Sequence, residues 1–206
     1  MSPVLLLLSL SPALLEVSGW LVVSTPAGDV EARPMLSHHR HPFWGFQGIP
    51  FAEPPVGDLK WLPPQPLRSK WNGTLDGSVS PPMCVQGFPD PEPTHDSLNV
   101  SRPLMFGYED CLILNVYTRD PTPPQLLPVL VWFHGGGLST GQGILYGPHF
   151  FIEMDIIVVT VNYRLGPWGS LSLDTPTISG NQVGRLDKTV AADTSNTLYW
   201  SIFCRA

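Results

Sequence analysis

Apolar residues in this chain occur in short runs separated by turns. Two runs, residues 127–133 and 156–163, are apolar without alternation, as is typical of strands buried on both faces of a mixed or parallel sheet. Residues 146–154, between them, can supply a helical turn or two. The pattern therefore predicts a mixed or parallel sheet, with strands at 21–24, 29–33, 43–47, 111–117, 127–133 and 156–163.

Composition limits the size and the partners of the chain. Its 206 residues are 43% hydrophobic and 14% charged, enough for one packed domain or part of a larger one. The 24 prolines cluster early, as at 54–55 and 63–66, and predict extended, turn-rich chain there. The net charge of −6, without a run of Lys or Arg, argues against nucleic acid as a partner. Oligomeric state is left open.

Glycines after one predicted strand suggest a catalytic feature. The run 127–133 is followed by His134 and by Gly135, Gly136 and Gly137. Glycines let backbone N–H groups face a cavity, and an HGGG element of this kind forms the oxyanion hole of acyl-transfer enzymes. The alternative is an ordinary glycine loop after a strand.

A cluster of histidines suggests a metal site at first sight. His38, His39 and His41 lie together at a predicted turn, 38–42. Because no carboxylate or cysteine is expected to converge on them, a solvated hairpin loop is favoured, and neither a metal nor a cofactor is predicted.

The N-terminus and the sequons suggest secretion. The apolar core 4–15 is too short to span a bilayer, and small residues at 17–19 predict a signal peptide, 1–19, cleaved after Gly19. A buried N-terminal helix is the alternative, and no later segment qualifies as a membrane span. Asn72 and Asn99 begin glycosylation sequons.

Three cysteines remain to be assigned. Cys84 and Cys111 enclose a loop rich in Pro, Gly, Asp and Asn, and a bridge there would stabilise the fold by about 3–4 kcal/mol. Cys204 is then left unpaired.

Several motifs together resemble the type-B carboxylesterases, the cholinesterase-like branch of the α/β-hydrolases. They cover roughly Trp20 to Asp187 in the family's order: FQGIPFAEPPVG at 46–57, EDCLILNV at 109–116, the HGGG element and NYRLG at 162–166. The resemblance implies an incomplete α/β-hydrolase fold. Residues 20–187 would be the N-terminal part of the family domain and 188–206 a divergent tail. The implied activity is hydrolysis of a small carboxyl ester without a cofactor.

The resemblance also implies roles for single residues. Gly136 and Gly137 match the glycine donors of the oxyanion hole. Cys84 and Cys111 match the family's first disulfide, at the rim of the active-site gorge.

Two ion pairs are implied as well. Arg164 and Asp187 match a buried pair that links a strand end to the following segment. Lys60 stands where the family usually has an arginine paired with Glu109, and a lysine cannot make the bidentate fork.

Aromatic residues in the 84–111 loop bear on the substrate. Cholinesterases place a tryptophan in this loop as a cation–π seat for choline, whereas here it holds Phe88, Phe106 and Tyr108 and no tryptophan. An uncharged ester is therefore expected.

The nucleophile, acid and base of the family mechanism have no match. The single G-x-S-x-G segment, 137–141, begins with an oxyanion glycine instead of following a strand, so Ser139 is interpreted as a decoy. The chain alone is expected to be inactive and to expose 127–133 as an unpaired edge. Two other readings stay open: a non-catalytic, neuroligin-like adhesion protein and a short secreted binding protein.

Overall fold

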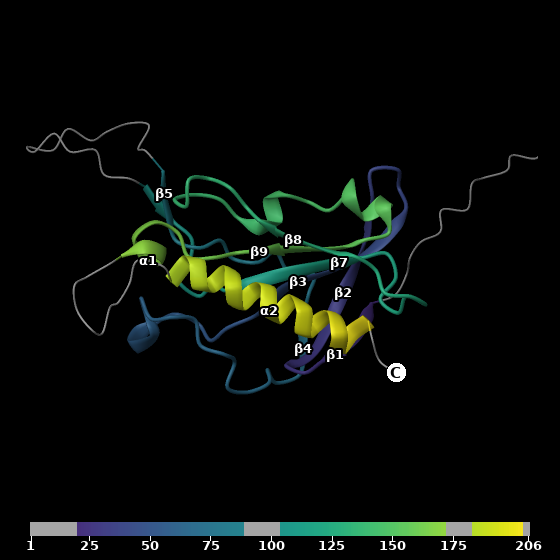
Figure 1. Cartoon of the computed structure of the whole chain (residues 1–206), viewed down its shortest axis with the longest axis horizontal. Coiled ribbons are helices and arrows are strands. Elements are labelled where there is room, and N and C mark those ends of the chain that lie inside the picture. Colours follow the sequence, from purple (N-terminus) through teal and green to yellow (C-terminus); the bar gives the residue numbers. More distant parts are fainter. Residues whose placement is uncertain (1–19, 89–103, 172–182, 204–206) are drawn as a thin grey trace, which may run out of the picture.

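The computed structural model describes residues 20–88, 104–171 and 183–203. Its centre is a seven-stranded mixed sheet in which the strands follow the order β1-β2-β3-β7-β9-β8, with β4 paired to β2 (Figure 1). All neighbours are antiparallel except β8 with β9 and β4 with β2. The strands are β1 (Leu21–Thr25), β2 (Gly28–Leu36), β3 (Pro42–Pro50), β4 (Thr74–Asp76), β7 (Ile113–Thr118), β8 (Val129–Phe133) and β9 (Ile157–Val161).

The core lies along the middle strands. Every residue of β7 and of β9 is buried, which explains their lack of polar alternation. β3 carries a bulge between Phe46 and Ile49. There Gly48 has a φ of 72° and its N–H donates to Asn115 Oδ1 at 3.0 Å. Each of the six predicted strands overlaps an observed strand, and the predicted segments 111–117, 127–133 and 156–163 extend by up to two residues beyond β7, β8 and β9.

Three short strands were not predicted. β4 adds to β2, and β5 (Gln86–Phe88) pairs with β6 (Leu104–Phe106) as a separate ribbon. Each has only three residues, too few for a hydrophobic period to appear in the sequence. The short helices are η1 (Gly57–Leu59), η2 (Gly143–Leu145), η3 (Phe151–Met154) and α1 (Gly166–Ser170), and η3 is the helical turn expected within 146–154.

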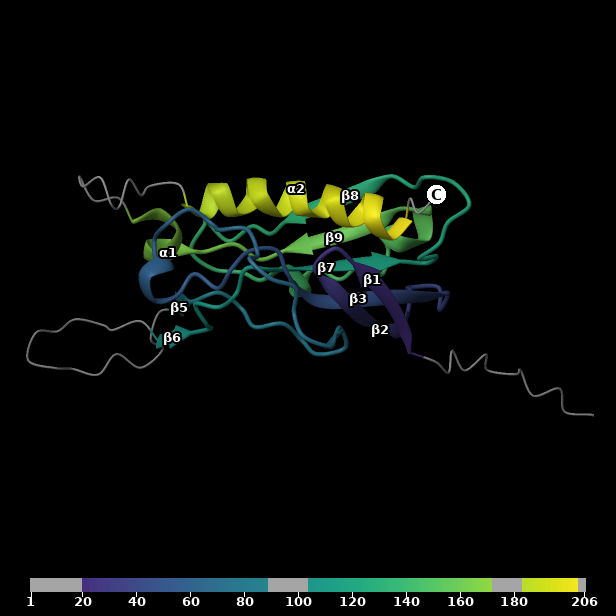
Figure 2. The same ribbon diagram turned by 90° about the horizontal axis from the view of Figure 1, so that it is seen from below.

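A long helix was also missed. α2 (Val183–Phe203) lies along one face of the sheet and crosses the predicted boundary at 187–188 without a break (Figures 1 and 2). Its buried positions recur with helical spacing, but they are mostly small or polar: Gly184, Asp187, Ala191, Ser195 and Leu198. Because these buried residues are mostly not apolar, the sequence of residues 188–203 shows no helical periodicity of hydrophobic positions.

β8 is an edge strand of the sheet, as predicted for the run 127–133. β9 pairs along one side of β8, and no strand among the described residues pairs along the other. Val131 and Phe133 pack against the core cluster that contains Ala191 and Leu198 of α2. The helix thus covers one face of β8 and leaves its outer edge unpaired.

Candidate active site

The glycine loop after β8 has a backbone that only glycine adopts easily. Gly136 has a φ of 111°, and a Cβ atom there would lie 2.0 Å from the carbonyl oxygen of Thr140. Gly137 and Leu138 follow with φ of 62° and 59°, and the left-handed conformation is unusual for a leucine. The loop closes on itself, because the N–H groups of Ser139 and Thr140 both donate to the Gly136 carbonyl at 3.1 Å.

The donors of the candidate oxyanion hole are the N–H groups of Gly136 and Gly137. Within the described part of the chain, neither donates a hydrogen bond to a protein group. A Cβ atom on Gly137 would meet nothing within 4 Å, so the loop is open on that side. Two adjacent, unused backbone donors beside open space suit an oxyanion.

The first residues of the disulfide loop hold the glycine loop in place. Gln86 is buried, and its Oε1 accepts from the Gly141 N–H at 2.9 Å while its Nε2 donates to the Gly141 carbonyl at 3.0 Å. The same Nε2 donates to the Cys84 carbonyl at 3.0 Å. One side chain therefore joins the disulfide to the end of the glycine loop, a role that sequence analysis did not assign.

Two more amide side chains connect the segment after the glycine loop to the segment before Cys84. Asn162, after β9, accepts from the Gly143 N–H at 2.8 Å and donates to the Pro82 carbonyl at 2.9 Å. Gln142 donates to the Pro81 carbonyl at 2.8 Å. These bonds to irregular backbone satisfy buried polar groups that no sheet ladder could pair.

His134 anchors the start of the loop. Its ring stacks on Tyr163 with centroids 4.4 Å apart, and the Tyr163 hydroxyl donates to the His134 carbonyl at 2.5 Å. On the same tyrosine ring, Lys188 Nζ lies 3.9 Å from the centroid. Burial lowers the pKa of His134 and Lys188 lowers it further, although the hydrogen bond to the Gly135 carbonyl opposes them; the net shift favours the neutral ring. Burial lowers the pKa of Lys188 as well.

The structure joins Arg164 and Asp187 in a buried, bidentate pair. Arg164 Nη2 donates to Asp187 Oδ1 at 2.7 Å, and both Nε and the backbone N–H of Arg164 donate to Oδ2 at 3.0 Å. The side chains are 4% and 0% exposed. This fork fixes the first turns of α2 to the end of β9.

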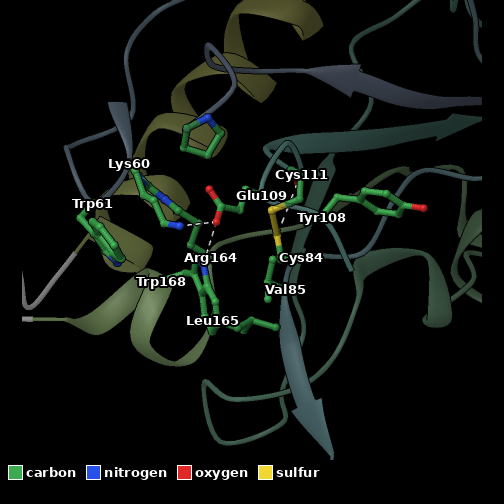
Figure 3. A pocket seen from close by; sticks show the side chains of 11 residues that line it. Lys60, Trp61, Cys84, Val85, Tyr108, Glu109, Cys111, Arg164, Leu165 and Trp168 are labelled. Carbon is green, nitrogen blue, oxygen red and sulfur yellow. Dashed lines mark hydrogen bonds and ion pairs between the residues drawn. A yellow bond between two sulfur atoms is a disulfide. The ribbon is translucent and has the colours of Figure 1, made fainter. Parts of the chain in front are cut away.

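Lys60 and Glu109 also meet, beside the disulfide. Lys60 Nζ contacts Glu109 Oε1, and Trp168 Nε1 donates to the same oxygen at 3.1 Å (Figure 3). The Lys60 hydrogen bond holds the pKa of Glu109 below its ordinary value, against the opposing effect of burial. Trp168 thus supplies a second donor where lysine lacks a fork, and nothing in its Gly-Pro-Trp-Gly context pointed to that role.

Cys84 and Cys111 form a disulfide with an S–S distance of 2.08 Å and a Cα–Cα distance of 5.0 Å. Both cysteines are buried against Tyr163 and Leu165. Of the loop aromatics, Phe106 and Tyr108 are 48% and 67% exposed, and the side chain of Phe88 lies outside the described residues.

Ser139 lacks the setting of a nucleophile. It lies in the turn after the glycines, and its hydroxyl donates to the Gly137 carbonyl at 3.2 Å. The next element is the three-residue η2, not a helix opening directly from a strand. Among the described residues, no histidine is hydrogen-bonded to Ser139.

One expectation about the histidine cluster was wrong. His38, His39 and His41 do lie at a hairpin turn, but a carboxylate converges on them: Glu153 of η3 contacts His39 Nδ1 and accepts from the His39 N–H at 2.7 Å. Glu153 is distant in sequence, so its approach could not be read locally. No group of three or more potential ligands is assembled in the described part of the chain.

The remaining predicted features lie mostly outside the described residues. The signal peptide 1–19, Asn99 and Cys204 fall there, whereas Asn72 is exposed beside β4. None of the helices in the described ranges is long and apolar enough to cross a membrane.

Comparisons with known proteins agree with this geometry. Residues 20–193 match the model of the carboxylesterase family. The chain is 39% identical over 162 residues to juvenile hormone esterase of Tribolium castaneum, covering 78% of this chain and 26% of that protein. It is 40% identical over 176 residues to carboxylesterase 1D of Rattus norvegicus, covering 82% and 31%.

A solved structure shows the same fold. The crystal structure of juvenile hormone esterase from Manduca sexta, with OTFP covalently attached, superposes with a TM-score of 0.73 at 30% identity. The match covers 89% of this chain and 34% of that one, so the chain has an incomplete α/β-hydrolase fold and spans about a third of its relatives' length.

Proposed function

Because this chain belongs to the carboxylesterase family, we propose that it supplies the oxyanion-hole portion of a secreted carboxylic ester hydrolase. Gly136 and Gly137 are the donors. The observation that carries the proposal is their pair of unused N–H groups, in a loop whose backbone requires glycine and whose ends are fixed by Gln86 and His134.

The mechanism follows from what such donors do. Attack on an ester carbonyl places negative charge on its oxygen, and preorganised N–H groups stabilise that charge more than they stabilise the neutral ester. One donor of this kind typically contributes a factor of about 10²–10³ in kcat.

This portion alone does not turn over esters. The reaction needs a serine, a histidine base and a carboxylate, and the third oxyanion donor comes from the residue after the nucleophile. Ser139 has neither the strand-to-helix setting nor a histidine partner among the described residues.

The substrate is an uncharged carboxyl ester. The 84–111 loop contains no tryptophan to seat a quaternary ammonium group, and its described aromatics, Phe106 and Tyr108, are exposed. The names of the relatives include a juvenile hormone esterase and carboxylesterases, and none of those named above is a cholinesterase.

Secretion rests on three features of different kinds. They are the signal-peptide pattern of residues 1–19, the exposed sequon at Asn72 and the Cys84–Cys111 disulfide, which suits an oxidising compartment.

A chimera tests the proposal. Residues 20–193 would replace the matching segment of rat carboxylesterase 1D, and hydrolysis of p-nitrophenyl butyrate and butyrylthiocholine would be compared. We expect activity on the uncharged ester, a fall in kcat of about 10²–10³ in Gly137→Ala, and little change in Gly135→Ala. Gly135 controls for the added methyl group, since a Cβ atom on either glycine meets nothing within 4 Å. Only Gly137 has a positive φ, of 62°, so alanine there also strains the backbone and displaces the N–H donor. Equal activity of the two variants in a folded chimera would contradict the role of Gly137.

A further inference from the structure

The direction of the Gly137 donor is set by the peptide group to which it belongs. In a planar trans peptide the carbonyl and the N–H point in opposite directions, so the Gly136 carbonyl determines where the Gly137 N–H points. That carbonyl accepts from the N–H groups of Ser139 and Thr140, both at 3.1 Å. The orientation of the donor therefore depends on the turn that follows it.

This turn is held from outside the glycine loop by the first residue of α1. The Leu138 carbonyl belongs to the same peptide group as the Ser139 N–H, and it accepts from the Gly166 N–H at 2.7 Å. Leu138 has a φ of 59°, a conformation that persists for a bulky residue only where the surrounding structure holds it. The bond from Gly166 supplies such a hold, so the position of α1 bears on the Gly137 donor.

The position of α1 in turn depends on its contacts. The helix has only five residues, and a helix of this length is not stable by itself. Its Trp168 Nε1 donates to Glu109 Oε1 at 3.1 Å, and Figure 3 shows the indole directed toward this carboxylate. Lys60 Nζ contacts the same oxygen, which fixes the acceptor in place. Trp168 thus fastens α1 to the segment that precedes Cys111.

We propose that Trp168 is a positioning residue for the oxyanion hole. By binding Glu109 it holds α1, and through the Gly166 N–H it holds the two peptide groups that orient the Gly137 donor. The inference rests on the proposed function of Gly137. A displacement of about 1 Å in a catalytic site can lower a rate by about 10²-fold, so a small shift of α1 is enough to reduce kcat.

This arrangement secures the glycine loop from both strands of the disulfide. Gln86, two residues after Cys84, binds the far end of the loop at Gly141. Glu109, two residues before Cys111, acts on the near end through α1. The two attachments use different side chains, so each can be removed without the other.

Amide hydrogen exchange of the full chain is the first test. Trp168→Phe keeps an aromatic ring and removes the indole donor. We expect the amides of Gly166 and Ser139 to exchange about tenfold faster in this variant, because a hydrogen bond to a charged group is lost. The Gly141 amide, which donates to Gln86 Oε1, is expected to keep its rate.

Trp71→Phe is the matched control for this exchange experiment. The Trp71 Nε1 donates to the Asp29 carbonyl at 2.8 Å, beside β1 and β2 at the opposite side of the sheet from β8. Its loss should leave the amides of Gly166 and Ser139 unchanged. Equal acceleration in both variants, or none in Trp168→Phe, would overturn the proposal.

The chimera with rat carboxylesterase 1D supplies the catalytic test. Trp168→Phe is expected to lower kcat for p-nitrophenyl butyrate about tenfold with KM unchanged, a smaller fall than that of Gly137→Ala. Glu109→Ala should give the same fall, whereas Glu109→Gln keeps an acceptor for the indole and should retain most of kcat. Combining Trp168→Phe with Glu109→Ala should lower kcat no further, since both remove one bond.

The outcomes separate this inference from the proposed function. A fall of kcat in Gly137→Ala with an unchanged kcat in Trp168→Phe would overturn the positioning role and leave the proposed function standing. A rise in KM without a fall in kcat in Trp168→Phe would overturn it as well, since it indicates a role in substrate binding. An unchanged kcat in Gly137→Ala would contradict the proposed function and this inference with it.

Discussion

Gln86 holds the backbone of Gly141 by both its N–H and its carbonyl group, at 2.9 and 3.0 Å. Because Gln86 is also bonded to the Cys84 carbonyl, the disulfide and the glycine loop form one rigid unit. The donors of the candidate oxyanion hole are thus positioned by a residue whose described hydrogen bonds go to Cys84 and Gly141 instead of to the donors themselves.

Gln86→Ala tests this relationship. The change leaves the two backbone groups of Gly141 without their partner, so we expect a loss of about 1–3 kcal/mol in the free energy of unfolding and faster amide exchange across 134–142. Gln125→Ala, at an exposed position, should change neither. An unchanged rate of amide exchange at Gly141 in the Gln86 variant would show that the glycine loop keeps its conformation without Gln86.

The buried pair of Arg164 and Asp187 predicts a larger effect. Asp187→Ala leaves a buried guanidinium without its carboxylate and is expected to cost about 3–5 kcal/mol in urea unfolding. Arg164→Lys should also destabilise the chain, because lysine cannot reproduce the two-oxygen fork. A loss below about 1 kcal/mol in Asp187→Ala would contradict the attachment of α2 through this pair.

The contact of Glu153 with the hairpin predicts that the stability of the fold depends on pH. Hydrogen bonds from His39, and then from Ser37, lower the pKa of Glu153 from 4.5 to about 2. A carboxyl group with a lowered pKa in the folded state stabilises the fold above its unfolded pKa and loses that effect as pH falls. The contribution of Glu153 should therefore be complete above pH 4.5 and disappear toward pH 2.

Thermal melting of Glu153→Gln checks this pH dependence. Its Tm should lie below that of the unchanged chain at pH 7 and approach it near pH 2.5. Asp58→Asn, at an exposed position, is the control. A Tm difference that is constant with pH would contradict the ionic character of the contact.

The cysteines predict a simple covalent pattern. Non-reducing peptide mapping should find Cys84 joined to Cys111 and Cys204 free. Replacing both bridged cysteines by alanine should cost about 3–4 kcal/mol, since the bridge closes a long loop. Cys204 joined to either partner in most molecules would refute the assignment.

The central strands and the glycine loop could be predicted because each has a local signal. Buried strands appear as unbroken apolar runs, and His134 with three glycines is a compact motif. Helix α2 gave no such signal, because Asp187, Ala191 and Ser195 face the sheet where leucines would usually mark a helix.

The attachment of the site could not be predicted from local pattern at all. Gln86, Trp168 and Glu153 act on partners more than 50 residues away, and their sequence surroundings resemble ordinary loops. Asn162 belongs to the NYRLG motif at 162–166, but its hydrogen bonds to Gly143 and Pro82 depend on how three loops meet. Such contacts depend on tertiary structure and produce no periodic pattern in the local sequence.

Labelling with a fluorophosphonate tests the central claim most directly, namely that this chain carries an oxyanion loop without its own nucleophile. The purified chain should take up no stoichiometric label under conditions that label rat carboxylesterase 1D. Labelling of about one group per chain, abolished in Ser139→Ala, would show an activated serine beside Gly137 and contradict the account.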